Sequence, residues 1–347
     1  MTESHFYHIA KDGALTQAAS LENALEVVKA GGYIWLDYFQ PGKEDLSSLI
    51  EPLGLHPLSI EDCIDQNQIP KIDDYPTNTF ILFNAFHTTE GMLSVTEVNA
   101  FLGRNFLVTV SNHNSHNLSL LNVIKRSVEI ENESASHGPA FLLHIILDQV
   151  VDEKFLAIEA LEEKLNEGEE VILSDLERFD PAELMHLRRD LLAVRKSLFH
   201  EREILVKICR KDSPFIPDKA IFLYRDIYDH LSKFFELTES YRDLVTSLME
   251  MYLSMLNNQM TRAANDTNII VRRLTFITTI FMPLTLLAGI GGMSEWSMMT
   301  GPQNWRIAYP AFLLAMVVLG VVNYLFLKRI EKRRSLKARK ERNRESI

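Results

Sequence analysis

The chain contains very little cysteine. Only Cys63 and Cys209 occur among its 347 residues, and neither belongs to a Cys-x-x-Cys pair. This argues against a disulfide framework and against a thiolate metal site, both of which need several cysteines. We interpret the two thiols as buried side chains of a protein in a reducing compartment. The stretch Met1 to Asp12 also lacks an apolar run, so no secretory signal peptide is expected.

Proline and glycine are absent from a long stretch of the chain. After Pro217 neither residue occurs until Pro283. Because these are the residues that most often interrupt helices, their absence predicts one helix from about Asp218 to Met293. Such a helix has roughly 76 residues and a length of about 110 Å at 1.5 Å per residue. Helices of this length rarely stand alone, which predicts self-association.

Charge is absent from two apolar runs near the C-terminal end. Leu274–Met293 has twenty residues and Ile307–Leu327 has twenty-one, each about the length that a helix needs to cross a bilayer. The net charge is −11, yet residues 328–347 hold ten Lys/Arg against three Asp/Glu. By the positive-inside rule this basic tail lies in the cytoplasm. A hairpin of two spans then places the large N-terminal part on the same side.

Residues 1–137 are expected to form an α/β domain. The segment Ser20 to Ala30 has the apolar spacing of a helix, with Ser20 as its N-cap and a Gly-Gly pair at its end. Other segments are rich in aromatic and β-branched residues, which predicts strands. The predicted strands are Tyr33–Tyr38 and Phe80–Phe86, followed by a hairpin of Glu97–Phe101 and Phe106–Val110.

Residues 138–212 are expected to form two helices. Pro139 suits the first turn of a helix, and apolar positions recur at helical spacing from Ala140 to Asn166. Asp180-Pro181 starts a second helix that runs to about Arg210. Residues 152–183 hold twelve Asp/Glu and three Lys/Arg. This density is typical of a solvated face, and the alternative is a diffuse reservoir for divalent cations.

Two segments that contain histidine are candidate sites. His56 has Glu61 and Asp62 nearby, which is a combination that a membrane-tethered hydrolase could use. No nucleophile or phosphate-binding loop lies near these residues in the sequence, so we favour helix capping as the role of His56. The spacing of His113 and His116 suits a metal on a helix, but their polar surroundings favour a loop. We therefore expect no enzyme activity.

A stripe of small and polar residues distinguishes the first apolar run from a simple anchor. A coiled-coil seam would be apolar along such a stripe, whereas the other faces of this run carry mostly Phe, Ile and Leu. The pattern favours a water-filled tube enclosed by several copies of the chain over helix packing. The stripe comprises Thr275, Thr278, Met282, Thr285, Gly289 and Gly292, and continues backward through Val271, Asn268, Ala264, Thr261, Asn257, Ser254 and Glu250.

Two motifs resemble those of the CorA magnesium channel family. The sequence Phe281-Met-Pro-Leu-Thr-Leu-Leu-Ala-Gly-Ile-Gly-Gly-Met-Ser294 is similar to the end of that family's first membrane helix, with its Pro-Leu-Thr, Ala-Gly-Ile and closing Gly-Met-Asn. Leu55–Asp62 and Gln68–Tyr75 resemble the family's cytoplasmic His-Pro-Leu…Glu-Asp and Pro-Lys…Asp-Tyr elements. With the two spans and the basic tail, the resemblance covers nearly the whole chain.

The resemblance implies a homopentameric funnel with a pore mouth at Gly292, Met293 and Ser294. There, neutral oxygens would touch the water shell of Mg²⁺, which gives up its water reluctantly. Each subunit would contribute six parts: a cytoplasmic α/β domain (1–137), an acidic antiparallel helix pair (138–212), a stalk helix that becomes the pore-lining span (218–293), an extracytoplasmic loop (294–306), an outer span (307–327) and a basic cytoplasmic tail (328–347).

The chain departs from the family pattern at the expected mouth. Ser294 stands where the family has Asn, and its shorter hydroxyl would give a wider, weaker ring. Glu295 would place one carboxylate per subunit near the mouth and raise the local cation concentration. Gly291 replaces the family's usual aromatic residue, which would loosen the end of the helix.

The resemblance also assigns a pore lining and regulatory positions. Met282 would form an apolar ring that gates the pore by dewetting, and its alternative role is packing between helices. Carboxylates of the stalk, Glu239, Asp243 and Glu250, would hold regulatory cations between cytoplasmic domains. The expected pore lining is Asn268, Val271, Leu274, Thr278, Met282, Thr285 and Gly289.

We therefore expect a passive divalent-cation channel of the bacterial-type cytoplasmic (inner) membrane, with both termini in the cytoplasm. Mg²⁺ is the default ion, Co²⁺ and Ni²⁺ are further ions, and no cofactor is expected. One alternative keeps the fold and transports zinc, resembling the ZntB branch of the superfamily. The other is a membrane-anchored sensing or scaffold protein that conducts no ion. The expected partners are copies of the chain and membrane lipid, with no nucleic acid.

Overall fold

The computed structural model describes residues 3–11, 14–65, 68–89, 92–111, 137–292 and 304–345. The chain forms two compact units, Met1–Leu253 and Ser254–Ile347. One helix, α9 (Ile221–Gly291), contributes to both.

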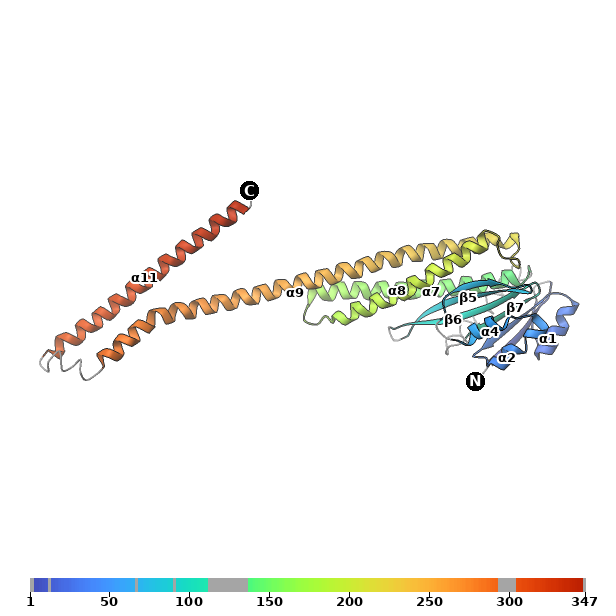
Figure 1. The fold of residues 1–347 in the computed structure, drawn as a ribbon, viewed down its shortest axis with the longest axis horizontal. Coiled ribbons are helices and arrows are strands. Elements are labelled where there is room, and N and C mark those ends of the chain that lie inside the picture. Colours follow the sequence, from blue (N-terminus) through green and yellow to red (C-terminus); the bar gives the residue numbers. More distant parts are fainter. Residues whose placement is uncertain are drawn as a thin grey trace. The chain divides into compact units, whose positions relative to one another are not determined.

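The first unit is built on a seven-stranded sheet (Figure 1). Its strand order is β2-β1-β3-β7-β6-β5-β4, in which the central β3–β7 pair is parallel and the other neighbours are antiparallel. The two strands and the hairpin expected from the sequence are confirmed, whereas β1, β2 and β4 were not predicted. The strands are β1 (Glu3–Ile9), β2 (Leu15–Gln17), β3 (Tyr33–Phe39), β4 (Lys71–Asp74), β5 (Asn78–Thr89), β6 (Met92–Gly103) and β7 (Phe106–Ser111).

Short helices pack on one face of this sheet. Their apolar residues and those of the strands form one buried cluster, which includes Leu46, Ile60 and Phe80. Ser20 caps α1 as expected, because its hydroxyl accepts a hydrogen bond from the Asn23 amide at 3.2 Å. The helices are α1 (Leu21–Val27), the 3-10 turn η1 (Val28–Ala30), α2 (Lys43–Ser47), α3 (Ile50–Leu53) and α4 (Pro57–Ile64).

The two cysteine thiols differ in their surroundings. Cys63 belongs to the buried cluster under α4, as expected, but Cys209 is only half-buried, so the prediction of two buried thiols is wrong for it. Burial raises the pKa of both thiols. A thiol whose pKa is raised is a poor nucleophile at neutral pH.

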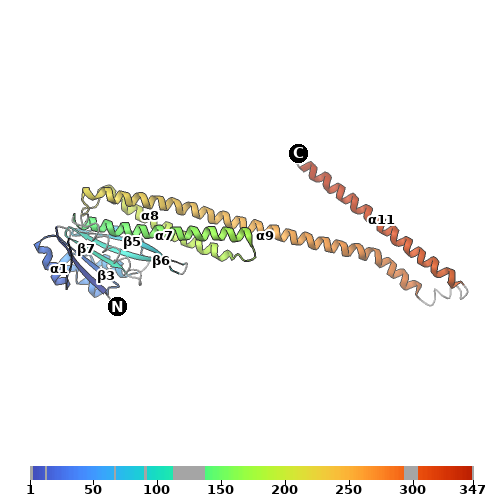
Figure 2. The same ribbon diagram turned by 180° about the vertical axis from the view of Figure 1, so that it is seen from behind.

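Three long helices complete the first unit. Helix α7 (Pro139–Ser174) packs on β5, β6 and β7 and against α8 (Pro181–Cys209). The first part of α9 follows the 3-10 turn η2 (Asp218–Ala220) and runs beside both helices in the two views (Figure 1 and Figure 2). The cap predicted at Asp180 is present, because its Oδ1 accepts a hydrogen bond from the Ala182 amide at 2.9 Å.

A buried ion pair links α7, α8 and β5. The Lys154 ammonium contacts the Glu201 carboxylate, and both side chains are fully buried. Glu201 also accepts a hydrogen bond from the backbone amide of Asn84 at 2.9 Å, and Lys154 Nζ lies 5.3 and 5.0 Å from the ring centres of Phe83 and Phe86. Burial lowers the pKa of Lys154, and the charge of Glu201 opposes that shift. The sequence did not predict this pair.

The second unit contains the end of α9 and α11 (Trp305–Glu345). By length and composition, two of the described helical stretches, Asp218–Gly291 and Arg306–Ile330, can each cross a membrane. The helix α11 continues past its apolar part to Glu345, so the backbone of the basic tail is helical up to that residue.

The two apolar helices contact each other along one side. The rings of Phe276 and Tyr324 meet edge to face, with centres 5.9 Å apart. At Gly291 an added Cβ would lie only 2.8 Å from the Phe312 ring. Gly291 therefore makes room for an aromatic ring of α11.

Candidate ion-conduction pathway

The side of α9 that faces α11 is apolar. From Phe276 onward the half-buried residues of the span recur at three- and four-residue steps, as expected for one contact face of a helix. They are Phe276, Ile280, Pro283, Leu284, Leu287 and Gly291.

The predicted pore-lining residues lie on the opposite side of α9. At 3.6 residues per turn, Thr278, Met282, Thr285 and Gly289 are about half a turn from the contact face. All four are exposed in the single chain, Met282 with 72% of its surface. These residues also line a shallow groove along the helix. The second span thus covers one side of α9 and leaves the predicted stripe open.

On the N-terminal side of Phe276, solvent exposure does not distinguish the stripe from the other faces of α9. Residues 257–275 are exposed on every side, and they include the predicted lining residues Asn268, Val271 and Leu274. Gly292 follows the last turn of α9, where its amide donates to the Ala288 carbonyl at 3.0 Å. Met293, Ser294 and Glu295 lie outside the residues that the structure describes, as do His113 and His116.

The threonines of the stripe present hydrogen-bond acceptors. The Thr278 hydroxyl donates to the Leu274 carbonyl at 2.7 Å, and the Thr285 hydroxyl donates to the Phe281 carbonyl at 2.9 Å. Because a hydroxyl has a single hydrogen, the lone pairs of these oxygens are left to accept from solvent. Water bound to a cation points its hydrogens outward. The stripe therefore suits a hydrated cation better than an anion.

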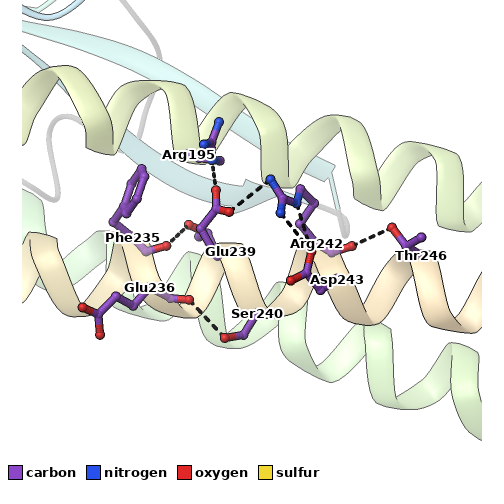
Figure 3. Close-up of polar contacts among 9 residues, drawn as sticks. Arg195, Phe235, Glu236, Glu239, Ser240, Arg242, Asp243 and Thr246 are labelled. Carbon is purple, nitrogen blue, oxygen red and sulfur yellow. Dashed lines mark hydrogen bonds and ion pairs between the residues drawn. The ribbon is translucent and has the colours of Figure 1, made fainter.

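Two of the three predicted regulatory carboxylates are already paired with arginines (Figure 3). Glu239 forms ion pairs with Arg195 of α8 and with Arg242, whose Nη1 is 3.0 Å from Glu239 Oε2. Arg242 Nη2 also lies 2.9 Å from Asp243 Oδ1. Glu250 is exposed. A cation that binds to Glu239 or Asp243 would have to compete with these arginines.

The acidic segment shows no arrangement of metal ligands. Of its twelve carboxylates all except Glu153 and Glu169 are exposed. Across the part of the chain that the structure describes, no group of three or more His, Cys, Asp or Glu side chains is placed to hold a metal ion. The solvated-face interpretation agrees with this exposure.

The histidine motif is structural, as the capping interpretation predicted. His56 Nδ1 accepts a hydrogen bond from the Leu58 amide at 3.2 Å, and the His56 ring stacks on Tyr75 with centres 4.7 Å apart. Lys71 Nζ lies 2.6 Å from Asp62 Oδ2. The two cytoplasmic motifs noted in the sequence therefore pack against each other, which explains why they occur together.

Sequence reasoning missed Asn323, which contacts α9 from the second span. Its Nδ2 donates to the Thr279 carbonyl at 3.1 Å. Asn323 is the one amide side chain in the apolar run 307–327. A single amide in an otherwise apolar span is a signal that could have identified it.

Comparison with known proteins agrees with this fold. The CorA-like Mg2+ transporter protein family matches residues 30–329. The YfjQ protein of Bacillus subtilis is 31% identical over 84% of this chain and 87% of its own length. The cobalt/magnesium transport protein CorA of Thermotoga maritima is 29% identical over 80% of this chain and 77% of its own.

Solved structures share the architecture. The complete CorA magnesium transporter from Methanocaldococcus jannaschii aligns with a TM-score of 0.68 and 22% identity, over 94% of this chain and 97% of that one. The cytoplasmic domain of ZntB from Vibrio parahaemolyticus aligns with a TM-score of 0.58 and 13% identity, over 73% of this chain and 98% of that one. These likenesses confirm the predicted fold class, an α/β domain with a long helix and two C-terminal apolar helices. The chain belongs to the CorA-like Mg2+ transporter family.

Proposed function

We propose that the chain is one subunit of a homopentameric, passive channel for divalent cations, with Mg²⁺ as its main ion. The observation that carries the proposal is the position of the stripe Thr278, Met282, Thr285 and Gly289, opposite the side of α9 that α11 covers. If several copies pack with α11 outward, the stripe lines a central path. Membership of the family and the names of the CorA relatives support Mg²⁺ and Co²⁺ as ions.

The proposed path combines polar and apolar rings. Thr278 and Thr285 supply acceptor oxygens to the water shell of the cation, so Mg²⁺ passes without losing most of its water. Met282, one turn from Thr278 and just before Thr285, is an apolar ring that closes the path by dewetting when the helices approach. We place the outer mouth at Gly292, Met293 and Ser294, with Glu295 collecting cations beside it.

The driving force in this proposal is the electrochemical gradient of the ion. With the basic tail and the N-terminal unit on the cytoplasmic side, the channel lies in the cytoplasmic membrane. A divalent cation that crosses a potential of 100 mV changes its free energy by about 4.6 kcal/mol. Such a gradient needs no covalent chemistry and no cofactor.

Ion flux into liposomes tests this proposal. Purified protein is reconstituted, and the uptake of Mg²⁺, Co²⁺, Ni²⁺ and Zn²⁺ is measured separately with an imposed inside-negative potential. We expect Mg²⁺ uptake that rises with the potential and is absent from protein-free liposomes. Zinc uptake without Mg²⁺ uptake would favour the second candidate, a zinc transporter, whose ZntB representative shares the cytoplasmic fold. Absence of all flux would favour an anchored sensor or scaffold.

Native mass spectrometry or analytical ultracentrifugation in detergent tests the assembly. Five copies per particle are expected, because a single hairpin of two spans cannot enclose a path. Particles that contain only one or two subunits would contradict the pore.

A further inference from the structure

Pro283 leaves one backbone carbonyl of α9 without its normal donor. In an α-helix the amide of residue 283 would donate to the carbonyl of residue 279, but proline has no amide hydrogen. Pro283 lies inside the helix α9, within the apolar run. In the hydrocarbon region water is not available to replace the missing bond, and an unsatisfied carbonyl there is strongly unfavourable.

Asn323 of the second span satisfies that same carbonyl. Its Nδ2 donates to Thr279 O at 3.1 Å. The Thr279 hydroxyl is not a substitute donor, because it donates to the Thr275 carbonyl at 2.7 Å. The amide of Asn323 thus supplies, from another helix, the hydrogen bond that the proline removes.

The hydrogen bond between Asn323 and Thr279 also affects the direction in which the stripe points. Phe276, two turns before Pro283 and on the same side, contacts Tyr324 of α11, so the Asn323 bond belongs to the contact face of the two helices. A directional hydrogen bond restricts the rotation of α9 about its axis, in addition to the restriction that side-chain packing imposes. The rotation decides whether Met282 and Thr285 point away from α11.

We propose that Asn323 is a positioning residue for the pore: it pairs the carbonyl freed by Pro283 and so holds the rotational setting of α9 that directs Met282 and Thr285 to the ion path. The effect on ion flux rests on the proposed channel function. The hydrogen bond from Asn323 to the Thr279 carbonyl does not rest on it, because that bond concerns the packing of two helices in one chain.

A double-mutant cycle on the full-length protein tests the pairing. The proteins are wild type, Asn323→Leu, Pro283→Ala and the double variant, and the readout is thermal unfolding in detergent. Asn323→Leu alone leaves the Thr279 carbonyl unpaired, so we expect it to shift the folding equilibrium by a factor of about 5 to 30. Pro283→Ala restores a backbone donor, so the same leucine substitution should have little effect in that background.

Tyr324→Phe serves as a matched control. It removes a hydroxyl from the neighbouring position of α11 but keeps the ring that packs on Phe276, and we expect near wild-type stability. If Asn323→Leu lowers stability equally with proline or alanine at position 283, the pairing is refuted. A leucine variant that folds only together with Pro283→Ala supports the pairing, and one that folds in neither background refutes it.

Mg²⁺ uptake in liposomes, measured for the four proteins of the cycle and for Tyr324→Phe, separates the two proposals. Asn323→Leu should reduce uptake more than Tyr324→Phe does. If wild type conducts no ion, the proposed function fails while the thermal cycle still decides the pairing. If wild type conducts and Asn323→Leu conducts equally well, the positioning role is wrong even where the thermal cycle shows coupling.

Discussion

The two units of the chain accommodate their apolar side chains in opposite ways. In residues 1–253, large side chains such as Trp35, Phe83 and Tyr224 are completely buried. In residues 254–347, the apolar windows of both spans are 0% buried, and side chains such as Met282 and Leu314 are 72% and 68% exposed. Since exposed apolar surface is unfavourable by about 25 cal/mol per Å² in water, we infer that lipid and, in the proposed pore, further subunits cover the second unit, whereas the first carries its own core.

The two units also differ in the polar groups that they place among apolar side chains. The first unit buries a full ion pair, Lys154–Glu201, because several surrounding donors and rings accompany it. The second unit uses single neutral groups, the Asn323 amide and the threonine hydroxyls, each donating to a backbone carbonyl. In a low-dielectric environment neutral partners avoid the desolvation penalty that a charge incurs. Changes in the first unit should therefore affect stability, and changes in the stripe should affect conduction.

The largest effect is expected from Lys154→Met. It leaves the Glu201 carboxylate buried without its counter-ion, which is typically unfavourable by about 3–5 kcal/mol. Thermal or denaturant unfolding of the full-length protein in detergent measures the loss. The double variant Lys154→Met/Glu201→Leu should recover most of the stability, because no unpaired charge is left. Equal destabilisation of the single and double variants would show that the pair is not the cause.

Met282→Ala tests the same contrast in the second unit. If the Met282 side chains of the several subunits together close the path, their removal should raise Mg²⁺ uptake by about tenfold. This corresponds to lowering the barrier by roughly 1.4 kcal/mol. The unfolding of the first unit should not change. Leu314→Ala, a similarly exposed apolar position on α11, is the matched control. Unchanged uptake in Met282→Ala would indicate that this methionine packs between helices and is not a gate.

A smaller effect is expected from Ser294→Asn at the proposed mouth. The longer amide places an oxygen farther into the ring, so preference for Mg²⁺ over Co²⁺, Ni²⁺ and Zn²⁺ should rise a few-fold, with little change in total flux. Competition between Mg²⁺ and each transition metal in the liposome assay measures it. If the order of ions stays the same, Glu295→Gln becomes the next variant, because a ring of carboxylates would then be the selective element.

The smallest effect concerns pH and stability in the first unit. Burial raises the pKa of Asp148, helped by the charges of Asp152 and Asp226 and opposed by His230. A carboxyl whose folded pKa exceeds its unfolded value loses stability as the pH rises through the interval between the two. Asp148→Asn should therefore raise the melting temperature slightly at pH 7 and have no such benefit well below pH 4, where the carboxyl is protonated in both states. A benefit that is independent of pH would point to packing.

Elements that depend on neighbouring residues could be predicted from the sequence. The caps at Ser20, His56 and Asp180 and the break before α9 follow from side chains that act on their own or adjacent backbone. The strands β1, β2 and β4 were not predicted because they lack the long apolar runs that mark the central strands. Only β1 also depends on a partner far away in the chain, because it pairs Glu3 with Phe39 of β3, whereas β2 and β4 pair with strands close to them in the sequence.

By itself, the sequence determined the two spans, the long unbroken helix and the polar stripe, because length, hydropathy and helical period are local properties of the chain. Only the tertiary structure decided which side of α9 the second span covers, that Phe312 fills the space beside Gly291, and that Asn323 pairs with Thr279. The partners in these contacts are tens of residues apart, and a contact between such residues depends on the packing of whole helices. No periodicity within either helix contains that information.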